Sequence, residues 1–296
     1  MKRTHGFTLI ELAIVLVIMT ILIGGLAMPL SAQIQARRIA ETRADMQAIH
    51  DALIGYAMSN YVAISPPACT CSYDSSGAYQ SSSSTCAETG LCPASTSTSP
   101  TGISFSPSRH YLPCPDTAND GIEGPRNSTT GNCEQTRGGL PWITLGVKGQ
   151  DAWGNRYTYA ITPEFGNNKI GFTSMSPAPP ATPPTNPSAG NLNIYPNNTC
   201  GTPSAAKDVP VIVVSHGPNG RGARNVNFIS STPTPAPPSD TSKDELQNLN
   251  RLESLLPCGD NTQFVSANPS DAFDDLLMWV SSNELFNRVC PSGGCP

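Results

Sequence analysis

"GFTLIELAIVLVIMTILIGG", residues 6–25, combines an almost unbroken apolar run with one acidic residue, Glu11. The run from residue 7 to residue 30 is long enough for a helix across a bilayer core, which needs about 20 residues. An ionised carboxylate is costly inside hydrocarbon unless a partner compensates its charge. A plain membrane anchor therefore explains the length of the run but not Glu11.

The residues that flank the run predict its orientation. Lys2 and Arg3 precede it, and positively charged residues stay on the cytoplasmic side, so the N-terminus is expected in the cytoplasm. A cleaved signal peptide would end near Leu30-Ser31-Ala32, which is a mediocre cleavage site. Glu11 interrupts the apolar core that such a signal needs, so neither this signal nor a plain anchor is favoured.

The residues around Gly6 favour a third interpretation. The short basic leader, residues 1–6, followed by Phe7-Thr8-Leu9-Ile10-Glu11, resembles the class III signal of type IV prepilins and pseudopilins. The resemblance implies that prepilin peptidase cuts after Gly6 and methylates the new amine of Phe7. Pro29 also stands where helices of this family carry a kinking proline.

The same resemblance implies a role for Glu11 in assembly. Cleavage creates a cationic amine at Phe7, since such amines titrate at about pH 8. In filaments of this family, the position of Glu11 meets the amine of a neighbouring subunit. Two opposite charges are tolerated together in an apolar setting where either one alone is not. Glu11 and Phe7 are therefore the expected assembly residues, with other pilin or pseudopilin subunits as partners.

The helix is expected to continue beyond the membrane, over residues 7–60, with residues 7–30 as the transmembrane or filament-core part. Apolar residues recur at helical spacing and predict one buried stripe, formed by Ile39, Met46, Ile49, Leu53 and Ala57. We expect a single helix of about 50 residues, kinked near Gly24, Gly25 and Pro29, whose second half packs on a globular head. His50, beside the stripe, is expected to be exposed or capping.

Composition favours an extracytoplasmic protein. Charged residues make up 13% of the chain, about half the usual share, and proline and glycine are abundant. The net charge of −5 gives no basic surface for nucleic acid. All ten cysteines follow residue 68, which predicts disulfides in an oxidising compartment. They are Cys69, Cys71, Cys86, Cys92, Cys114, Cys133, Cys200, Cys258, Cys290 and Cys295, and the expected short pairs are Cys114–Cys133 and Cys290–Cys295.

Residues 61–296 form the expected head, of fold class α+β: an antiparallel sheet on the long helix, with long disulfide-stapled loops. Polar residues 65–108 and the proline-rich tracts 176–190 and 231–240 are expected loops. Short apolar runs predict strands at 157–161 (half-buried), 169–172, 209–214, 225–229 and 276–280. Ser242 and Glu245 predict a capping box for a short helix that continues through Leu246, Leu249, Leu252 and Leu256, and a last helix is expected from about Ser282.

Two motifs in the head resemble the sheet region of major pseudopilins of type II secretion. Asp151, Trp153, Gly154, Tyr157 and Tyr159 match an Asp-x-Trp-Gly-x-x-Tyr-x-Tyr motif. Ser215, Gly217 and Gly220 match a following turn that helps that family bind calcium, but Asn219 stands in place of its usual aspartate. The resemblance implies a structural calcium only weakly, and no cofactor is required.

Other candidate chemistry is sparse. Asp116, Asp120 and Glu123 lie in a glycine-containing loop that offers oxygen ligands to calcium, but Ala118 occupies a ligand position, so a turn is favoured. Ser215-His216-Gly217 lacks the Gly-x-Ser-x-Gly elbow of hydrolases and is interpreted as a polar strand end. Trp142 and Trp153 are expected in or near the core. An anchored periplasmic enzyme is therefore disfavoured.

The expected function is that of a non-enzymatic, type IV pilin-like subunit of a pilus or pseudopilus, such as that of a type II secretion system. The large head favours a minor or tip-proximal subunit. An adhesin-like head with residues 65–135 as its contact surface is the alternative. The expected location is the bacterial inner membrane, in a single pass with a periplasmic head, and then the filament or cell surface.

Overall fold

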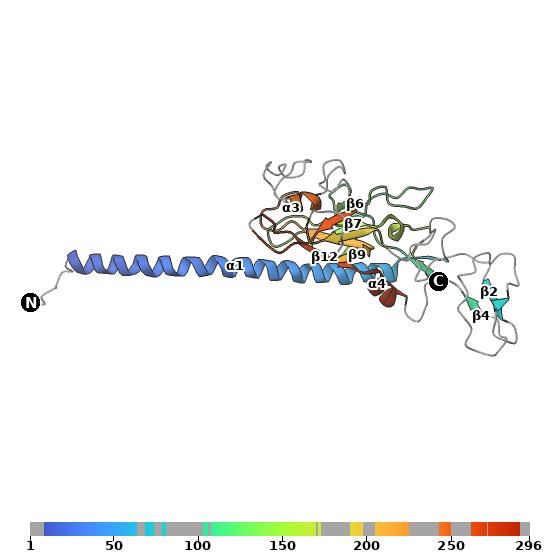
Figure 1. Ribbon diagram of the computed structural model, residues 1–296, viewed down its shortest axis with the longest axis horizontal. Helices are drawn as coiled ribbons and strands as arrows, with labels where there is room; N and C mark the ends of the chain where they lie inside the picture. The colour runs from blue at the N-terminus through green and yellow to red at the C-terminus, as the bar shows by residue number, and fades with distance from the viewer. Residues whose placement is uncertain are drawn as a thin grey trace, which may run out of the picture.

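A computed structural model of the chain describes residues 9–63, 69–73, 79–80, 103–105, 108–169, 171–172, 190–197, 205–224, 243–249, 262–270 and 272–290. Helix α1 (Leu9–Ser59) has 51 residues and runs through Gly24, Gly25 and Pro29 as one helix. Figure 1 shows its first half projecting away from the head, which lies against its second half. The expected long helix is confirmed.

The head is built around a four-stranded antiparallel sheet in the order β12-β10-β7-β6. Its strands are β12 (Leu276–Val280), β10 (Val211–Ser215), β7 (Thr158–Ile161) and β6 (Arg137–Gly139). A second sheet has the order β11-β8-β9, in which β8 pairs parallel to β11 and antiparallel to β9. Its strands are β11 (Gln263–Val265), β8 (Leu192–Tyr195) and β9 (Ala206–Val209). The α+β fold class is confirmed.

Two smaller sheets lie between the long helix and the main sheet in the sequence. Strand β1 (Tyr61–Ala63) pairs antiparallel with β5 (Ser108–His110). Strand β2 (Cys69–Tyr73) pairs with both β3 (Tyr79–Gln80) and β4 (Ile103–Phe105). Part of the expected polar excursion, residues 65–108, is therefore folded into short strands, and its remainder lies outside the described residues.

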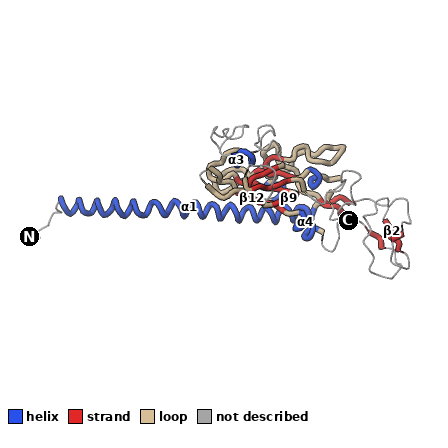
Figure 2. The backbone as a smooth tube through the Cα atoms, viewed as in Figure 1, coloured by secondary structure: helices blue, strands red, loops and turns tan. Residues whose placement is uncertain are grey.

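The central sheet is buried on both faces. Tyr159 and Val213 belong to the cluster that packs against Ile49 and Leu53 of α1. The alternate residues of the same strands, such as Ile212, pack with the second sheet. Figure 2 shows the strands lying over the second half of α1. The prediction that 157–161 is half-buried was therefore wrong, because the second sheet covers the face that would otherwise meet water.

The apolar stripe on α1 is confirmed in its second half. Met46, Ile49, Leu53 and Ala57 are all at most 4% exposed, and their spacing places them on one face of the helix. Ile39, two helical turns before Met46, is only partly buried. The core contact thus begins close to Thr42 and continues to the end of the helix.

Four shorter helical segments lie among the described residues of the head. They are α2 (Trp142–Leu145), the 3-10 turn η1 (Pro163–Gly166), α3 (Lys243–Asn248) and α4 (Ser282–Val289). Ser281 caps α4, since its hydroxyl accepts a hydrogen bond from the backbone N–H of Glu284 at 3.2 Å. The expected last strand and helix are confirmed. Leu252 and Leu256, expected to continue α3, lie outside the described residues.

His50 was expected on the surface, and this prediction was wrong. Its side chain is buried where α4 packs on α1, with Nδ1 3.3 Å from Asp51 and Nε2 3.3 Å from Glu284. The sequence of α1 alone places His50 beside the stripe and contains no sign of the distant helix that covers it.

Two strand predictions also changed. The expected strand 209–214 is divided at Pro210, so Val209 ends β9 and Val211 begins β10. In the expected strand 169–172, the N–H groups of Lys169 and Gly171 are taken by Asn167, at 2.8 and 2.9 Å, which makes a turn. Phe172 forms only a single bridge with His110. The expected strand 225–229 lies outside the described residues, as do the proline-rich tracts apart from Gly190.

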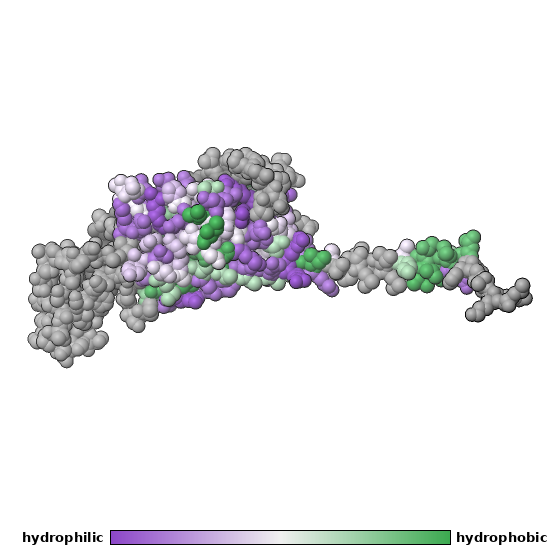
Figure 3. Space-filling model, turned by 180° about the vertical axis from the view of Figure 1, so that it is seen from behind, coloured by the Kyte–Doolittle hydropathy of each residue, from purple (hydrophilic) through white to green (hydrophobic). Residues whose placement is uncertain are grey.

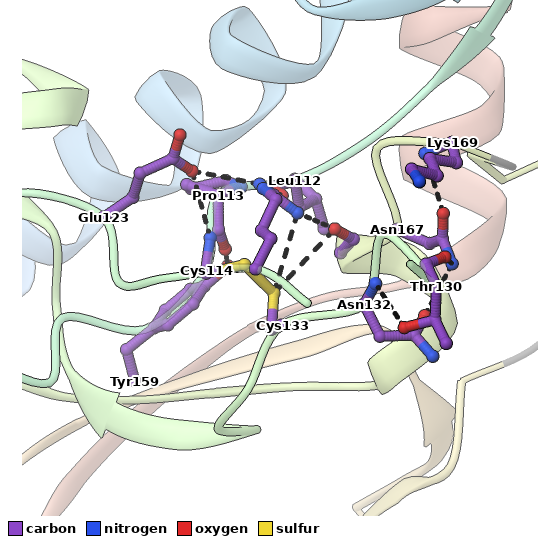
Figure 4. Close-up of a disulfide and its surroundings, with 12 residues drawn as sticks. Leu112, Pro113, Cys114, Glu123, Thr130, Asn132, Cys133, Tyr159, Asn167 and Lys169 are labelled. Carbon is purple, nitrogen blue, oxygen red and sulfur yellow. Dashed lines mark hydrogen bonds and ion pairs between the residues drawn. A yellow bond between two sulfur atoms is a disulfide. The ribbon is translucent and has the colours of Figure 1, made fainter. Parts of the chain in front are cut away.

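The disulfide between Cys114 and Cys133 is confirmed (Figure 4). Beside it, Arg126 donates to the carbonyl oxygens of Leu112 and Gly166 and pairs with Glu123 at 3.0 Å. These contacts join the loop that follows β5 to η1. Cys290 is also disulfide-bonded, and its expected partner Cys295 lies outside the described residues.

Candidate functional site

The beginning of α1, residues 9–21, is an exposed apolar rod. Every residue from 9 to 21 is exposed, and its large apolar side chains range from 50% exposed at Val15 to 90% at Leu9. Figure 3 shows hydrophobic side chains at the end of the rod furthest from the head. Monomeric soluble proteins rarely expose a contiguous apolar surface of this kind, so it marks a surface for contact with protein or lipid.

Glu11 lies in the first turn of this rod and is exposed. A carboxylate there interacts favourably with the positive end of the helix dipole. Gly6 and Phe7, the expected processing residues, lie outside the described residues. Across the part of the chain that the structure describes, no helix has an apolar stretch of the length and hydropathy needed to cross a membrane.

A polar clasp fixes the head to α1 where the exposed rod ends. Lys148 Nζ lies 3.3 Å from Glu41 and 2.9 Å from Asp45 on the helix. Trp153 Nε1 donates to Gln35 at 3.4 Å, so this tryptophan contacts the helix rather than the core of the head. The segment 148–153 therefore sets how far along α1 the head sits.

The structure brings the two resembled motifs of the head together. Asp151 accepts hydrogen bonds from the backbone N–H groups of Trp153 and Asn155, at 3.0 and 2.9 Å. Its other oxygen accepts from the hydroxyl of Ser215 at 2.7 Å. Burial of this carboxyl raises its pKa. Asp151 thus ties the clasp segment to the end of β10, so Ser215 has a structural role.

The turn after β10 approaches three carboxylates. Gly217 adopts a φ of +58°, and a Cβ there would lie 2.4 Å from the carbonyl oxygen of Asp274, so the close approach requires glycine. Glu245, Asp274 and Asp275 have ligand atoms that all lie within 4.8 Å of one another. Among the described residues, they form the one group of three or more acidic, histidine or cysteine side chains with this property. Sequence reasoning missed Asp274 and Asp275, although an acidic pair directly before an apolar strand was a signal.

Glu245 contacts the turn after β10. Asn219 Nδ2 donates to its carboxylate at 2.6 Å, and Arg221 Nη1 lies 3.5 Å away. The backbone N–H of Asn219 donates to Asp274 at 2.9 Å. Ser242, the other residue of the predicted capping box, lies outside the described residues.

These residues do not fit a calcium site. Calcium needs six to eight oxygen ligands, whereas Asn219 presents an N–H donor and Arg221 a guanidinium to Glu245. Asp275 accepts from Asn248 at 2.9 Å. The oxygen Oδ1 of Asp274 is buried without a hydrogen-bond partner, which leaves a single uncommitted ligand atom on these three side chains.

The three carboxylates that the sequence predicted as metal candidates make hydrogen bonds and ion pairs within the protein. Asp116 accepts from the N–H groups of Asn119 and Gly121, at 2.7 and 2.8 Å, which organises the loop as a turn. Asp120 is exposed and accepts from its near neighbour Ile122. Glu123 pairs with Arg126. The structure does not bring these three carboxylates together.

His216 was expected at a polar strand end but is fully buried. Its Nε2 lies 2.8 Å from the hydroxyl of Thr158, and its Nδ1 lies 3.6 Å from Asp275. These contacts connect β10, β7 and the start of β12. The histidine therefore belongs to a buried polar network rather than to the solvent-exposed surface.

Asp274 should make the stability of the head depend on pH. Burial, with Glu245 nearby, raises its pKa from 3.8 to about 7. Between these values the folded state holds a proton that the unfolded chain releases, so the free energy of unfolding falls as pH rises from about 4 to about 7. Because Asp274 is partly exposed, solvent screens the interaction and we expect a loss of only about 1–2 kcal/mol.

Thermal unfolding in EDTA at pH 4 and pH 8 checks this expectation. Asp274→Asn should unfold at a higher temperature than the parent chain at pH 8 and at a similar temperature at pH 4. Asp120→Asn, which changes an exposed carboxylate, is the matched control and should follow the parent chain. Stabilisation of the parent chain by added calcium at pH 8, absent in Asp274→Asn, would contradict the hydrogen-bonded arrangement described above.

Comparison with known proteins identifies the N-terminal segment. Residues 1–27 match the family model of the prokaryotic N-terminal methylation motif. This match includes Gly6, Phe7 and Glu11, and it supports a class III signal of the type IV pilin and pseudopilin kind. No curated protein and no solved structure matches the chain.

Proposed function

We propose that this chain is a structural subunit of a type IV pilus or related pseudopilus, assembled through the first half of α1. One observation carries the proposal: the helix that begins in the methylation motif exposes apolar side chains throughout residues 9–21, while its second half is built into the head. A rod of this kind needs lipid before assembly and other apolar helices after it.

In this proposal, residues 7–30 lie in the inner membrane until the leader is removed. Cleavage after Gly6 exchanges the basic leader for a cationic amine at Phe7. Glu11 of one subunit then pairs with that amine on its neighbour, which rewards one register of helix packing and disfavours slipped ones. The Cys114–Cys133 disulfide supports a head that folds in an oxidising compartment, such as the periplasm.

We further propose a minor or tip-proximal position in the filament. The head, residues 61–296, has more than two hundred residues. A head of this size is hard to repeat at every step of a narrow helical filament. Low stoichiometry relative to a smaller pilin in isolated filaments is expected. Equal abundance of the two would count against this position.

The mature N-terminus tests the proposal directly. Intact mass of the chain purified from a host with prepilin peptidase should correspond to a start at methylated Phe7. Gly6→Val should retain the whole leader, because the side chain blocks cleavage, and should stay in the membrane fraction. A mature chain that begins at Gln33 would show an ordinary signal peptide and would overturn the proposal.

A further inference from the structure

A polar cavity of about 240 Å³ lies at the β6 edge of the main sheet. Arg137 pairs across the sheet with Ala160, which packs with the second sheet, so both residues point to the face opposite α1. Arg156, just before β7, and Arg224, beyond the turn after β10, line the same cavity. Three arginines from separate segments of an acidic chain therefore meet at one place.

The wall of the cavity holds two of these arginines in fixed positions. Arg156 stacks on Trp142, with its guanidinium carbon 3.8 Å from the ring centroid, and its Nη1 donates to the carbonyl of Gly149. Its Nε is buried without a hydrogen-bond partner. Arg137 is 8% exposed and lies 4.3 Å over the ring of Phe264. Stacking fixes the guanidinium planes before any ligand arrives.

The described lining residues of the cavity carry more positive than negative charge: three arginines and one carboxylate. Asp116 is the one carboxylate among the described lining residues, and both its oxygens already accept backbone N–H groups. Asp275, behind the wall, interacts electrostatically with Arg137. Burial nevertheless lowers the pKa of Arg137 to about 9, which shows how costly its charge is in this setting.

We propose that this cavity binds a small ligand through an oxyanion, either a carboxylate or a phosphate group. Guanidinium groups match the geometry of both anions through paired N–H donors, and those of Arg137, Arg156 and Arg224 all line this cavity. Thr117, Asn119 and Gln135 offer polar side chains to the rest of the ligand. The volume suits a molecule of the size of a monosaccharide acid or a sugar phosphate.

The proposal does not depend on how the chain assembles. The cavity lies at the edge of the sheet, where Arg137 points away from α1 while Tyr157 belongs to the core beside the helix, and none of its lining residues belongs to the exposed rod. The second sheet and the 116–121 turn form its surroundings instead. A ligand bound there would be carried on the head whether the chain is in the membrane or in a filament.

Binding to the full chain in detergent tests the proposal at constant ionic strength. The probes are sodium phosphate, galacturonate and glucose 6-phosphate, with chloride as the reference anion. At least one probe should raise the unfolding temperature and bind with a dissociation constant below about 1 mM. Phosphate alone would identify a free-anion site, and galacturonate or the sugar phosphate alone would identify an acidic sugar site.

Arg224→Gln is the decisive variant, because Arg224 is partly exposed at the cavity and is expected not to be needed for folding. It should weaken binding at least tenfold. Arg288→Gln removes an equally positive side chain on α4, far from the cavity in sequence and paired with Asp51, and should change binding less than twofold. Arg156→Lys keeps the charge but loses the paired donors and should also weaken binding. No response to any probe at 20 mM, or equal losses in Arg224→Gln and Arg288→Gln, would overturn the proposal.

Discussion

Glu11→Ala should leave the chain cut and methylated at Phe7 but lower its incorporation into filaments at least tenfold. The substitution removes one half of the proposed ion pair and leaves the amine of the neighbouring subunit unpaired in an apolar environment. Breaking such a pair costs about 3–5 kcal/mol, which is more than a tenfold change in an equilibrium. Because the peptidase acts before assembly, processing should continue.

The measurement is the amount of tagged chain in sheared filaments, relative to the amount in membranes, with intact mass to confirm processing. Glu11→Gln keeps the size of the side chain and should fail in the same way, since charge rather than shape is at stake. Glu134→Ala, which removes an exposed carboxylate from the head, is the matched control. Normal incorporation of Glu11→Ala would refute the ion pair.

Leu53→Ala should lower the free energy of unfolding of the head by about 2–5 kcal/mol. Leu53 is fully buried between α1 and the main sheet, in the cluster that contains Tyr159 and Val213. Removing its side chain leaves a cavity at the contact that fixes the head to the helix. The head should then unfold at lower denaturant concentration, while the first half of α1 is unaffected.

Urea unfolding of the full chain in detergent, followed by tryptophan fluorescence, gives the midpoint for each variant. Met58→Ala lies on the same helix, but Met58 is 54% exposed. The free energy of unfolding of this variant should therefore stay within about 0.5 kcal/mol of the parent value. Equal effects of the two substitutions would show that α1 does not supply the core of the head.

Periodic and local features were predictable from the sequence. Spacings of three and four residues identified the buried stripe from Met46 to Ala57, because one face of a regular helix meets the sheet. The short apolar run 276–280 identified the last strand, and the last helix was expected from about Ser282. The pair Cys114–Cys133 was predicted from the short loop between its cysteines.

Contacts between distant segments were not predictable. His50 is buried by a helix more than two hundred residues later, and Glu245 accepts a hydrogen bond from Asn219 in the distant turn after β10. Thr158 and Ala160 looked exposed in a half-buried pattern, but a second sheet covers them. In each case the contacting residues lie far away in the sequence, so the local sequence pattern around the buried residue does not reveal them.

The sequence by itself supplied the N-terminal methylation motif and identified the helix that the protein exposes, because the motif, the apolar run and Glu11 all lie within residues 1–30. The tertiary structure alone decided where Arg137, Arg156 and Arg224 meet and that the oxygen Oδ1 of Asp274 is buried without a hydrogen-bond partner. Charged side chains form a binding site only when folding brings them together and away from water. Their separation in the sequence does not reveal their distance in space.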